Sequence, residues 1–199
     1  MALFSPQNID RLVSVYRATR KAGRTLVLDL YGASVAAATG NDAIPQASWD
    51  GVRVYVPQAQ RVRVKASGEF ARVQEIADSR IYGEDLATDP DRYVLLFRES
   101  MARELTRASC LDGAIAIWSM WAGYLKQPSG VRLCEFLDAR GIPLAIHHAS
   151  GHATSADLLR LAQAIKAKRV VPIHTATPQA FLGLVDNAEI RKDGEWWNV

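Results

Sequence analysis

The sequence predicts an α/β fold with a mainly parallel sheet and helices on both faces. Helical and strand-like segments alternate along the 199 residues. The strand candidates are short apolar runs rich in β-forming residues, which is typical of strands buried on both faces. Strands that alternate with helices form βαβ units, and such units build parallel sheets.

Six segments are predicted strands, because each is apolar and has the length of a buried strand. They are residues 25–31, 52–56, 93–97, 113–119, 144–148 and 169–173. Residues 61–66 are ambiguous, since RVRVKA alternates like a strand while its flanks would allow a helix. The terminal segment 189–199 has Asp-Gly between β-prone residues and is predicted to form a hairpin.

The helices between these strands are predicted from apolar periodicity and from capping residues. Apolar residues from Ile9 to Tyr16 follow helical spacing, and Gly23 ends that helix. The other predicted helices are 33–39, 100–108, 129–141, 154–166 and one that opens at residue 177. The expected capping residues are Ser129, Thr154 with Asp157 as a capping box, and Thr177 followed by Pro178.

The composition is that of a soluble globular protein, with 49% hydrophobic and 23% charged residues. No run approaches the roughly 18 apolar residues of a membrane span, and the N-terminus lacks the pattern of a signal peptide. We therefore expect a cytoplasmic protein with no membrane partner. A net charge of +3 permits a polyanionic partner without requiring one. Cys110 and Cys134 lack metal-ligand spacing and are expected to be buried, unpaired thiols.

All four histidines lie between His147 and His174. His148 and His174 end two predicted strands, and His152 follows the turn after the first. Because ligands collect at the carboxyl ends of parallel strands, His148, His152 and His174 are expected to converge. Ser150, Gly151 and the free amides of the helix at residue 154 would add an anion site.

This segment resembles the C-terminal part of the β-CASP branch of the metallo-β-lactamase superfamily, which includes ribonuclease J. In that family His-x-Ser-Gly-His precedes a helix and a strand ending in Pro-x-His; here these are His148-Ala-Ser-Gly-His152 and Pro-Ile-His174. The resemblance implies that His152 contacts phosphate next to the scissile group and acts in catalysis. His174 would complete the coordination of one zinc, and His148, Ser150 and Gly151 would contact a substrate phosphate.

The resemblance also extends upstream, where residues 7–31 look like the start of the β-CASP insert: a helix, then Gly-Arg and an apolar strand. It implies a Rossmann-like β-CASP domain over residues 1–141. Residues 142–199 would be the C-terminal strand-helix-strand piece of a metallo-β-lactamase fold with its terminal hairpin.

Most zinc ligands of the family come from a His-x-His-x-Asp-His segment, whereas this chain has no histidine before residue 147. The resemblance therefore implies the distal part of a zinc-dependent phosphodiester hydrolase that is inactive alone and holds no stoichiometric metal. Expected partners are a separately encoded N-terminal metallo-β-lactamase half and RNA or another nucleic acid. A second copy of the chain is also expected, to cover an apolar surface on residues 142–199.

Two alternatives remain. The chain could be a non-catalytic β-CASP module that binds nucleic acid or protein through basic groups. These groups are Arg53, Arg61, Arg63, Lys65, Lys166, Lys168 and Arg169. It could also be a Rossmann-like binding protein with an anion site at the helix that begins at residue 154, although no G-x-G-x-x-G or P-loop pattern supports a nucleotide.

Overall fold

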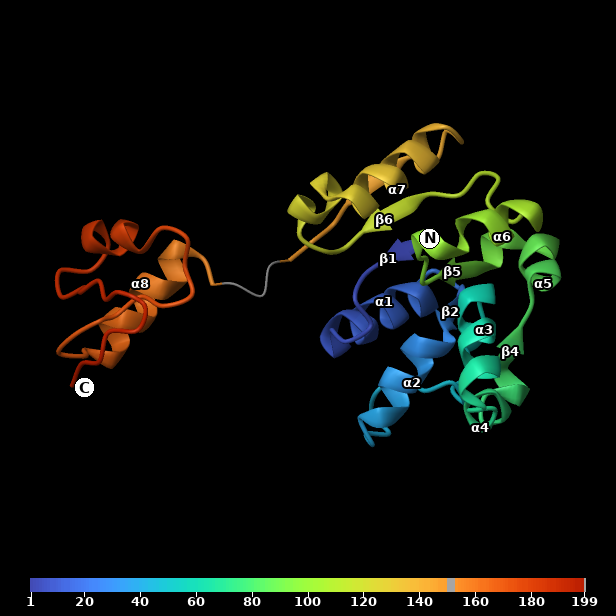
Figure 1. Cartoon of the computed structure of the whole chain (residues 1–199), viewed down its shortest axis with the longest axis horizontal. Helices are drawn as coiled ribbons and strands as arrows, with labels where there is room; N and C mark the ends of the chain where they lie inside the picture. Colours follow the sequence, from blue (N-terminus) through green and yellow to red (C-terminus); the bar gives the residue numbers. More distant parts are fainter. Residues whose placement is uncertain (150–152, 199) are drawn as a thin grey trace. The chain divides into compact units, whose positions relative to one another are not determined.

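A computed structural model of the chain describes residues 1–149 and 153–198. Backbone contacts divide the chain into two compact units, Met1–Ala149 and Ser150–Val199. Figure 1 shows the elements of both units, coloured along the sequence. The boundary expected between residues 141 and 142 separates two domains of the family, not two compact units. It therefore stays a prediction.

The first unit is built on one layer of parallel strands. These are β1 (Ala2–Leu3), β2 (Thr25–Asp29), β3 (Val52–Tyr55), β4 (Arg80–Ile81), β5 (Tyr93–Leu95), β6 (Ala116–Trp118) and β7 (Leu144–Ile146). They pair in the orders β4-β3-β2-β5 and β1-β6-β7, always in parallel. A parallel bridge between Ala2 and Leu96 joins the two sheets, and the Phe97 amide donates to the Ala2 carbonyl at 2.9 Å. The predicted parallel sheet is therefore confirmed.

Helices connect the strands and cover both faces of this layer. The α-helices of the first unit are α1 (Ile9–Lys21), α2 (Leu30–Ala38), α3 (Gln58–Ser67), α4 (Ala71–Gln74), α5 (Gly83–Thr88), α6 (Ala102–Arg107) and α7 (Pro128–Asp138). Short 3₁₀ turns lie at Ala77–Ser79, Pro90–Arg92, Glu99–Met101 and Ala122–Lys126. Leu28 packs with Leu12 of α1, whereas its neighbour Val27 packs with Leu105 of α6 and Leu133 of α7. Because successive strand residues point to opposite faces, α1 lies on one face and α6 and α7 on the other.

Three local predictions change in the first unit. The strand predicted over 25–31 ends at Asp29, because the Asp29 carboxylate caps α2 by accepting from the Gly32 amide at 2.8 Å. The ambiguous residues 61–66 lie within α3. Ser129 is not the cap of its helix: Gln127 is the N-cap, and Pro128 occupies the first helical position, where its missing N–H costs little.

Two strands and two α-helices of the first unit were not predicted at all: β1, β4, α4 and α5. Each strand has two residues, too few to show a periodicity, and the two helices span four and six residues. Their conformation depends on neighbours that lie far away in the sequence, since β1 pairs with β6 and β4 pairs with β3. Such pairings leave no local signal.

The second unit contains α8 (Ser155–Ile165) and the 3₁₀ helix η5 (Pro178–Gly183). The strand predicted over 169–173 is wrong, because Val170 makes only an isolated bridge to Ala188. The predicted terminal hairpin is also wrong for residues 189–198, where a turn joins the Glu195 amide to the Lys192 carbonyl at 3.2 Å without strand pairing. None of residues 153–198 is buried. A strand needs several consecutive paired residues, and the described residues of this unit supply a single bridge.

Two expectations from composition can be compared with the structure. Cys110 and Cys134 are unpaired as expected, but they are half-buried rather than buried. In residues 1–149 and 153–198, no helix has both the length and the apolar character needed to cross a membrane.

Helix α3 offers a direct test of the segment that the sequence left ambiguous. Val64 packs against α2 and β3 and is 8% exposed, whereas Val62 is 61% exposed. We expect Val64→Ala to lower the free energy of unfolding by about 2 kcal/mol through lost burial and a cavity. Val62→Ala should change it by less than about 0.5 kcal/mol. Denaturant unfolding of both variants measures this; equal losses would indicate a strand, in which both residues share one face.

Candidate functional site

The carboxyl ends of the parallel strands form the edge of the sheet at which a site is expected. The chain leaves β1 toward α1 on one face, whereas it leaves the neighbouring strands β5 and β6 toward α6 and α7 on the other. Divergent connections of adjacent strands open a crevice at the sheet edge. A cleft of about 400 Å³ lies there. It is lined by residues 3–7, Tyr31, residues 97–99, Trp118, Met120 and the start of α7.

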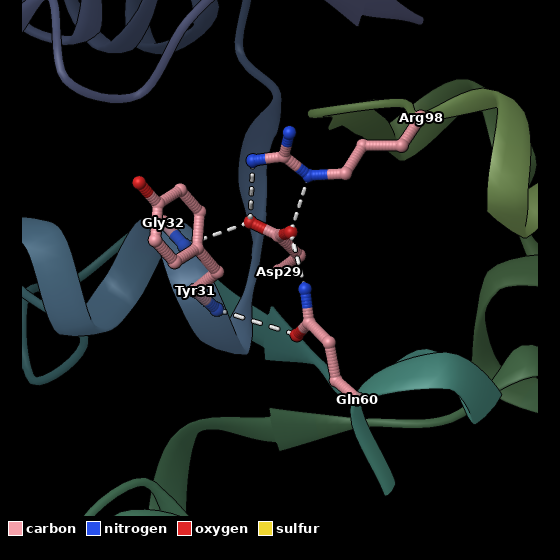
Figure 2. Close-up of polar contacts among 5 residues, drawn as sticks. All are labelled: Asp29, Tyr31, Gly32, Gln60 and Arg98. Atoms are coloured by element: carbon pink, nitrogen blue, oxygen red, sulfur yellow. Dashed lines mark hydrogen bonds and ion pairs between the residues drawn. The ribbon is translucent and has the colours of Figure 1, made fainter. Parts of the chain in front are cut away.

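A buried carboxylate next to this cleft organises the loops around it. Asp29 is fully buried at the end of β2. Figure 2 shows its oxygens accepting from Arg98 Nε at 2.5 Å, from Gln60 Nε2 at 2.6 Å and from the Gly32 amide at 2.8 Å. A side chain at Gly32 would place its Cβ 2.8 Å from the Asp29 carboxylate, so only glycine fits there. Asp29 thus joins α2, α3 and the segment after β5.

Arg98 both pairs with Asp29 and lines the cleft. Its side chain is 32% exposed, and its guanidinium lies 5.4 Å from the centre of the Tyr31 ring. The Tyr31 hydroxyl accepts from Gln7 Nε2 at 2.9 Å, and the Tyr31 amide donates to Gln60 at 3.3 Å. The pairing with Asp29 neutralises the charge of Arg98, so this cleft has a fixed, largely neutral floor. Asp29 is thus both paired with an arginine and placed at the end of its strand, as a buried carboxylate requires.

The first two histidines lie where β7 ends. The His147 amide donates to the Trp118 carbonyl at 2.9 Å, and its carbonyl accepts from Ser119 Oγ at 2.5 Å. This backbone pairing extends the strand by one residue, and the side chains of His147 and His148 are exposed. Arg11 Nη2 donates to the Ala149 carbonyl at 3.0 Å and links the end of the first unit to α1. The predicted site residues Ser150, Gly151 and His152 lie outside the described residues.

The second unit holds the start of α8 and His174. Thr154 caps α8 as predicted: its hydroxyl accepts from the Asp157 amide at 3.2 Å and donates to the Asp157 carboxylate at 2.7 Å. That carboxylate also pairs with Arg160, and its contacts with Thr154 and Arg160 lower its pKa. His174 is exposed and has a left-handed backbone, with φ of 56°. Since His148 and His174 belong to different units, their convergence stays a prediction.

The described residues do not fit a zinc ion by themselves. Within residues 1–149 and 153–198, no three His, Cys, Asp or Glu side chains are grouped so that they could hold a metal. A catalytic zinc needs about three protein ligands and a water. The assignment of His174 to a metal therefore requires ligands beyond those that the structure describes.

Comparison with protein families decides where the C-terminal segment belongs. Residues 144–194 match the model of the Zn-dependent metallo-hydrolase RNA specificity domain, RMMBL. This segment is therefore similar to that domain. The match supports the assignment of the chain to the β-CASP and metallo-β-lactamase family, which the motif around His148 and His174 predicted. The comparison with curated proteins gives no match.

The RMMBL domain associates the segment with RNA and with zinc-dependent hydrolysis. The matched segment spans β7, α8 and η5, and thus includes every site residue that the sequence singled out. It does not assign roles to those residues. The roles of His148, Ser150, Gly151, His152 and His174 therefore stay predictions.

The buried Asp29–Arg98 pair should be essential for the fold around the cleft. We expect Asp29→Asn to lower the free energy of unfolding by about 3 kcal/mol, the low end for breaking a buried pair, because Arg98 is partly exposed. The control is Asp50→Asn. Asp50 pairs with Arg20 at 2.8 Å but is 91% exposed, so the loss should stay below about 1 kcal/mol. Denaturant unfolding compares the two, and equal losses would contradict the central role of Asp29.

The ligand count predicts weak metal binding by this chain alone. After dialysis, the purified chain should retain well under about one zinc per molecule, because a stable site needs three or more protein ligands. Elemental analysis by mass spectrometry measures this. One zinc per chain that survives dialysis and disappears in His174→Ala would contradict the expectation.

Proposed function

We propose that this chain is the RNA-binding part of a ribonuclease J-like, zinc-dependent phosphodiester hydrolase, with most of the metal ligands supplied by another segment or another chain. The match of residues 144–194 to an RNA specificity domain of metallo-hydrolases carries the proposal. The parallel sheet of the first unit supports it, since the predicted phosphate-contacting residues follow its strand β7 at the carboxyl edge. By this proposal the protein is cytoplasmic.

The proposed roles follow the family motif residue by residue. His152 contacts the phosphate next to the scissile bond, and His148, Ser150 and Gly151 contact a substrate phosphate. The capped start of α8 supports this, because the first amides of a helix attract anions. His174 completes a zinc site whose other ligands come from an N-terminal metallo-β-lactamase half. By the same proposal, the β-CASP domain spans residues 1–141 and the metallo-β-lactamase piece spans 142–199.

We also propose that the second unit associates with a further surface, most simply a second copy of the chain. Large apolar side chains of residues 153–198 are exposed to solvent. They include Leu161, Ile165, Ile173, Leu182 and Trp196, with exposed fractions from 56% to 98%. Apolar surface of this kind marks interaction sites in soluble proteins.

The second candidate is a module that binds RNA without any catalytic role. The absence of a grouped metal-ligand set in the described residues favours it. The two functions differ in one respect: the first requires that an N-terminal metallo-β-lactamase half restores hydrolysis. The module would bind RNA equally well with or without that half.

The proposal predicts salt-dependent RNA binding by this chain alone. We expect a single-stranded RNA to bind at low salt, with an affinity that falls by a log–log slope of about −0.7 for each phosphate neutralised. Fluorescence anisotropy across a salt series measures this. No binding at low salt, or a flat salt response, would show that the chain is not the RNA-binding part.

Cleavage should appear only when an N-terminal half and zinc are added. His152→Ala and His174→Ala should then abolish cleavage and leave anisotropy binding within about threefold of the unmodified chain, since most phosphate contacts remain. His147→Ala is the matched control, because the motif assigns that histidine no role. If it lost cleavage equally, the motif-based roles would be wrong.

A further inference from the structure

A second cleft, rich in arginine, lies farther along the carboxyl edge of the same sheet. It has a volume of about 320 Å³ and lies at the ends of β3 and β4, beside α3 and α6. We call it the arginine cleft and define it by Arg61, Arg80, Arg107, Tyr55, Tyr82, Glu84 and Glu104, which all line it. Nothing in the family match covers it, since that match begins at residue 144.

One of its two carboxylates is already satisfied by the protein. Glu104 accepts from the Gln58 amide at the start of α3, at 3.1 Å to each oxygen, and from Arg61 Nη2 at 3.2 Å. Burial and the nearby Glu104 carboxylate raise the pKa of Tyr55, which therefore stays a neutral hydroxyl. The charges of Arg61 and Glu104 thus neutralise each other within the cleft, and Tyr55 adds no negative charge.

The other two arginines are not neutralised in this way. Within the described part of the chain, neither Arg80 nor Arg107 has a carboxylate at ion-pair distance, although Glu84 also lines the cleft. The Arg80 guanidinium lies over the Tyr82 ring at 4.8 Å. Its Nε atom is buried and has no hydrogen-bond partner among the described residues. Two arginines against one exposed glutamate leave the cleft with a net positive charge.

This arrangement suits a phosphate better than other ligands. A guanidinium held by stacking presents its N–H groups as a planar fork, which matches the oxygens of a phosphate. A phosphate between Arg80 and Arg107 would accept hydrogen bonds from their guanidinium groups and neutralise the excess charge of the cleft.

We propose that the arginine cleft binds a backbone phosphate of an RNA strand, between Arg80 and Arg107. This inference rests on the proposed function, because it deepens the RNA binding suggested for the chain. The cleft and the end of β7 share one edge of the sheet, and the order β4-β3-β2-β5-β1-β6-β7 separates them by six strand spacings. At about 4.8 Å for each spacing, that distance is roughly 30 Å. An RNA of several nucleotides can span it, whereas a mononucleotide cannot.

Charge-matched double variants test the proposal. The test variant is Arg80→Gln with Arg107→Gln, and the control is Arg17→Gln with Lys21→Gln, two exposed cations on α1. With a uridine oligonucleotide of about 12 nucleotides, we expect the test variant to lose about tenfold in affinity and about 0.7 of the salt slope for each lost phosphate contact. The control should change affinity by less than about threefold, as expected for long-range charge alone. Anisotropy gives both values, and circular dichroism checks folding.

A measurement on the unmodified chain covers the case in which the test variant does not fold. The Nε–Hε resonance of Arg80 should shift in NMR spectra when the oligonucleotide is added, and that of Arg17 should not. Two results would contradict phosphate binding in the arginine cleft and leave the proposed function intact. In the first, RNA binds without moving the Arg80 resonance; in the second, RNA binds the test variant and the control equally well. If the unmodified chain binds no RNA, the proposed function and the RNA ligand of the cleft are both wrong.

Discussion

The buried carboxylate of Asp29 is the constraint on which the architecture of the first unit depends. It ends β2, caps α2, and holds Gln60 of α3 and Arg98 after β5. A buried charge is costly unless it is paired and hydrogen-bonded, so these partners cannot move independently. Three segments that are separate in the sequence, β2 with α2, α3 and the residues after β5, are thereby fixed around one point at the carboxyl edge of the sheet.

That edge is where the chemistry of the first unit is concentrated. Parallel pairing brings every strand end to the same side, and the change in connection direction at β1 opens a cleft between its neighbours. The two clefts differ in charge because of their internal pairing. In the first cleft, Arg98 forms an ion pair with Asp29. In the arginine cleft, Arg80 and Arg107 have no carboxylate at ion-pair distance among the described residues, so their positive charge is not neutralised.

The described part of the second unit buries little apolar surface of its own. None of its described residues is buried, and its helix α8 exposes apolar side chains such as Leu161 and Ile165. Small units with little buried area are marginal when alone. Most of this unit lies within the segment that is similar to the RNA specificity domain of Zn-dependent metallo-hydrolases. Exposed apolar residues of this kind are typical of interaction surfaces.

The sequence by itself determined the class of the fold and suggested the family. Alternating apolar runs and helical periodicity were enough for a parallel sheet, and the motif from His148 to His174 was enough to suggest the β-CASP relationship that the RMMBL match supports. Local capping chemistry also determined the start of α8 at Thr154. These features are encoded within short windows, so one sequence can show them.

Only the tertiary structure decided the features that depend on distant partners. It assigned residues 61–66 to a helix, because Val64 packs against α2 and β3 while Val62 faces solvent. It removed the strand at 169–173, since Val170 makes only an isolated bridge to Ala188. It also paired Asp29 with Arg98, whereas Arg80 and Arg107 have no carboxylate at ion-pair distance among the described residues. The physical reason is the same in each case: strand pairing, burial and charge compensation are settled by residues that meet only after the chain has folded.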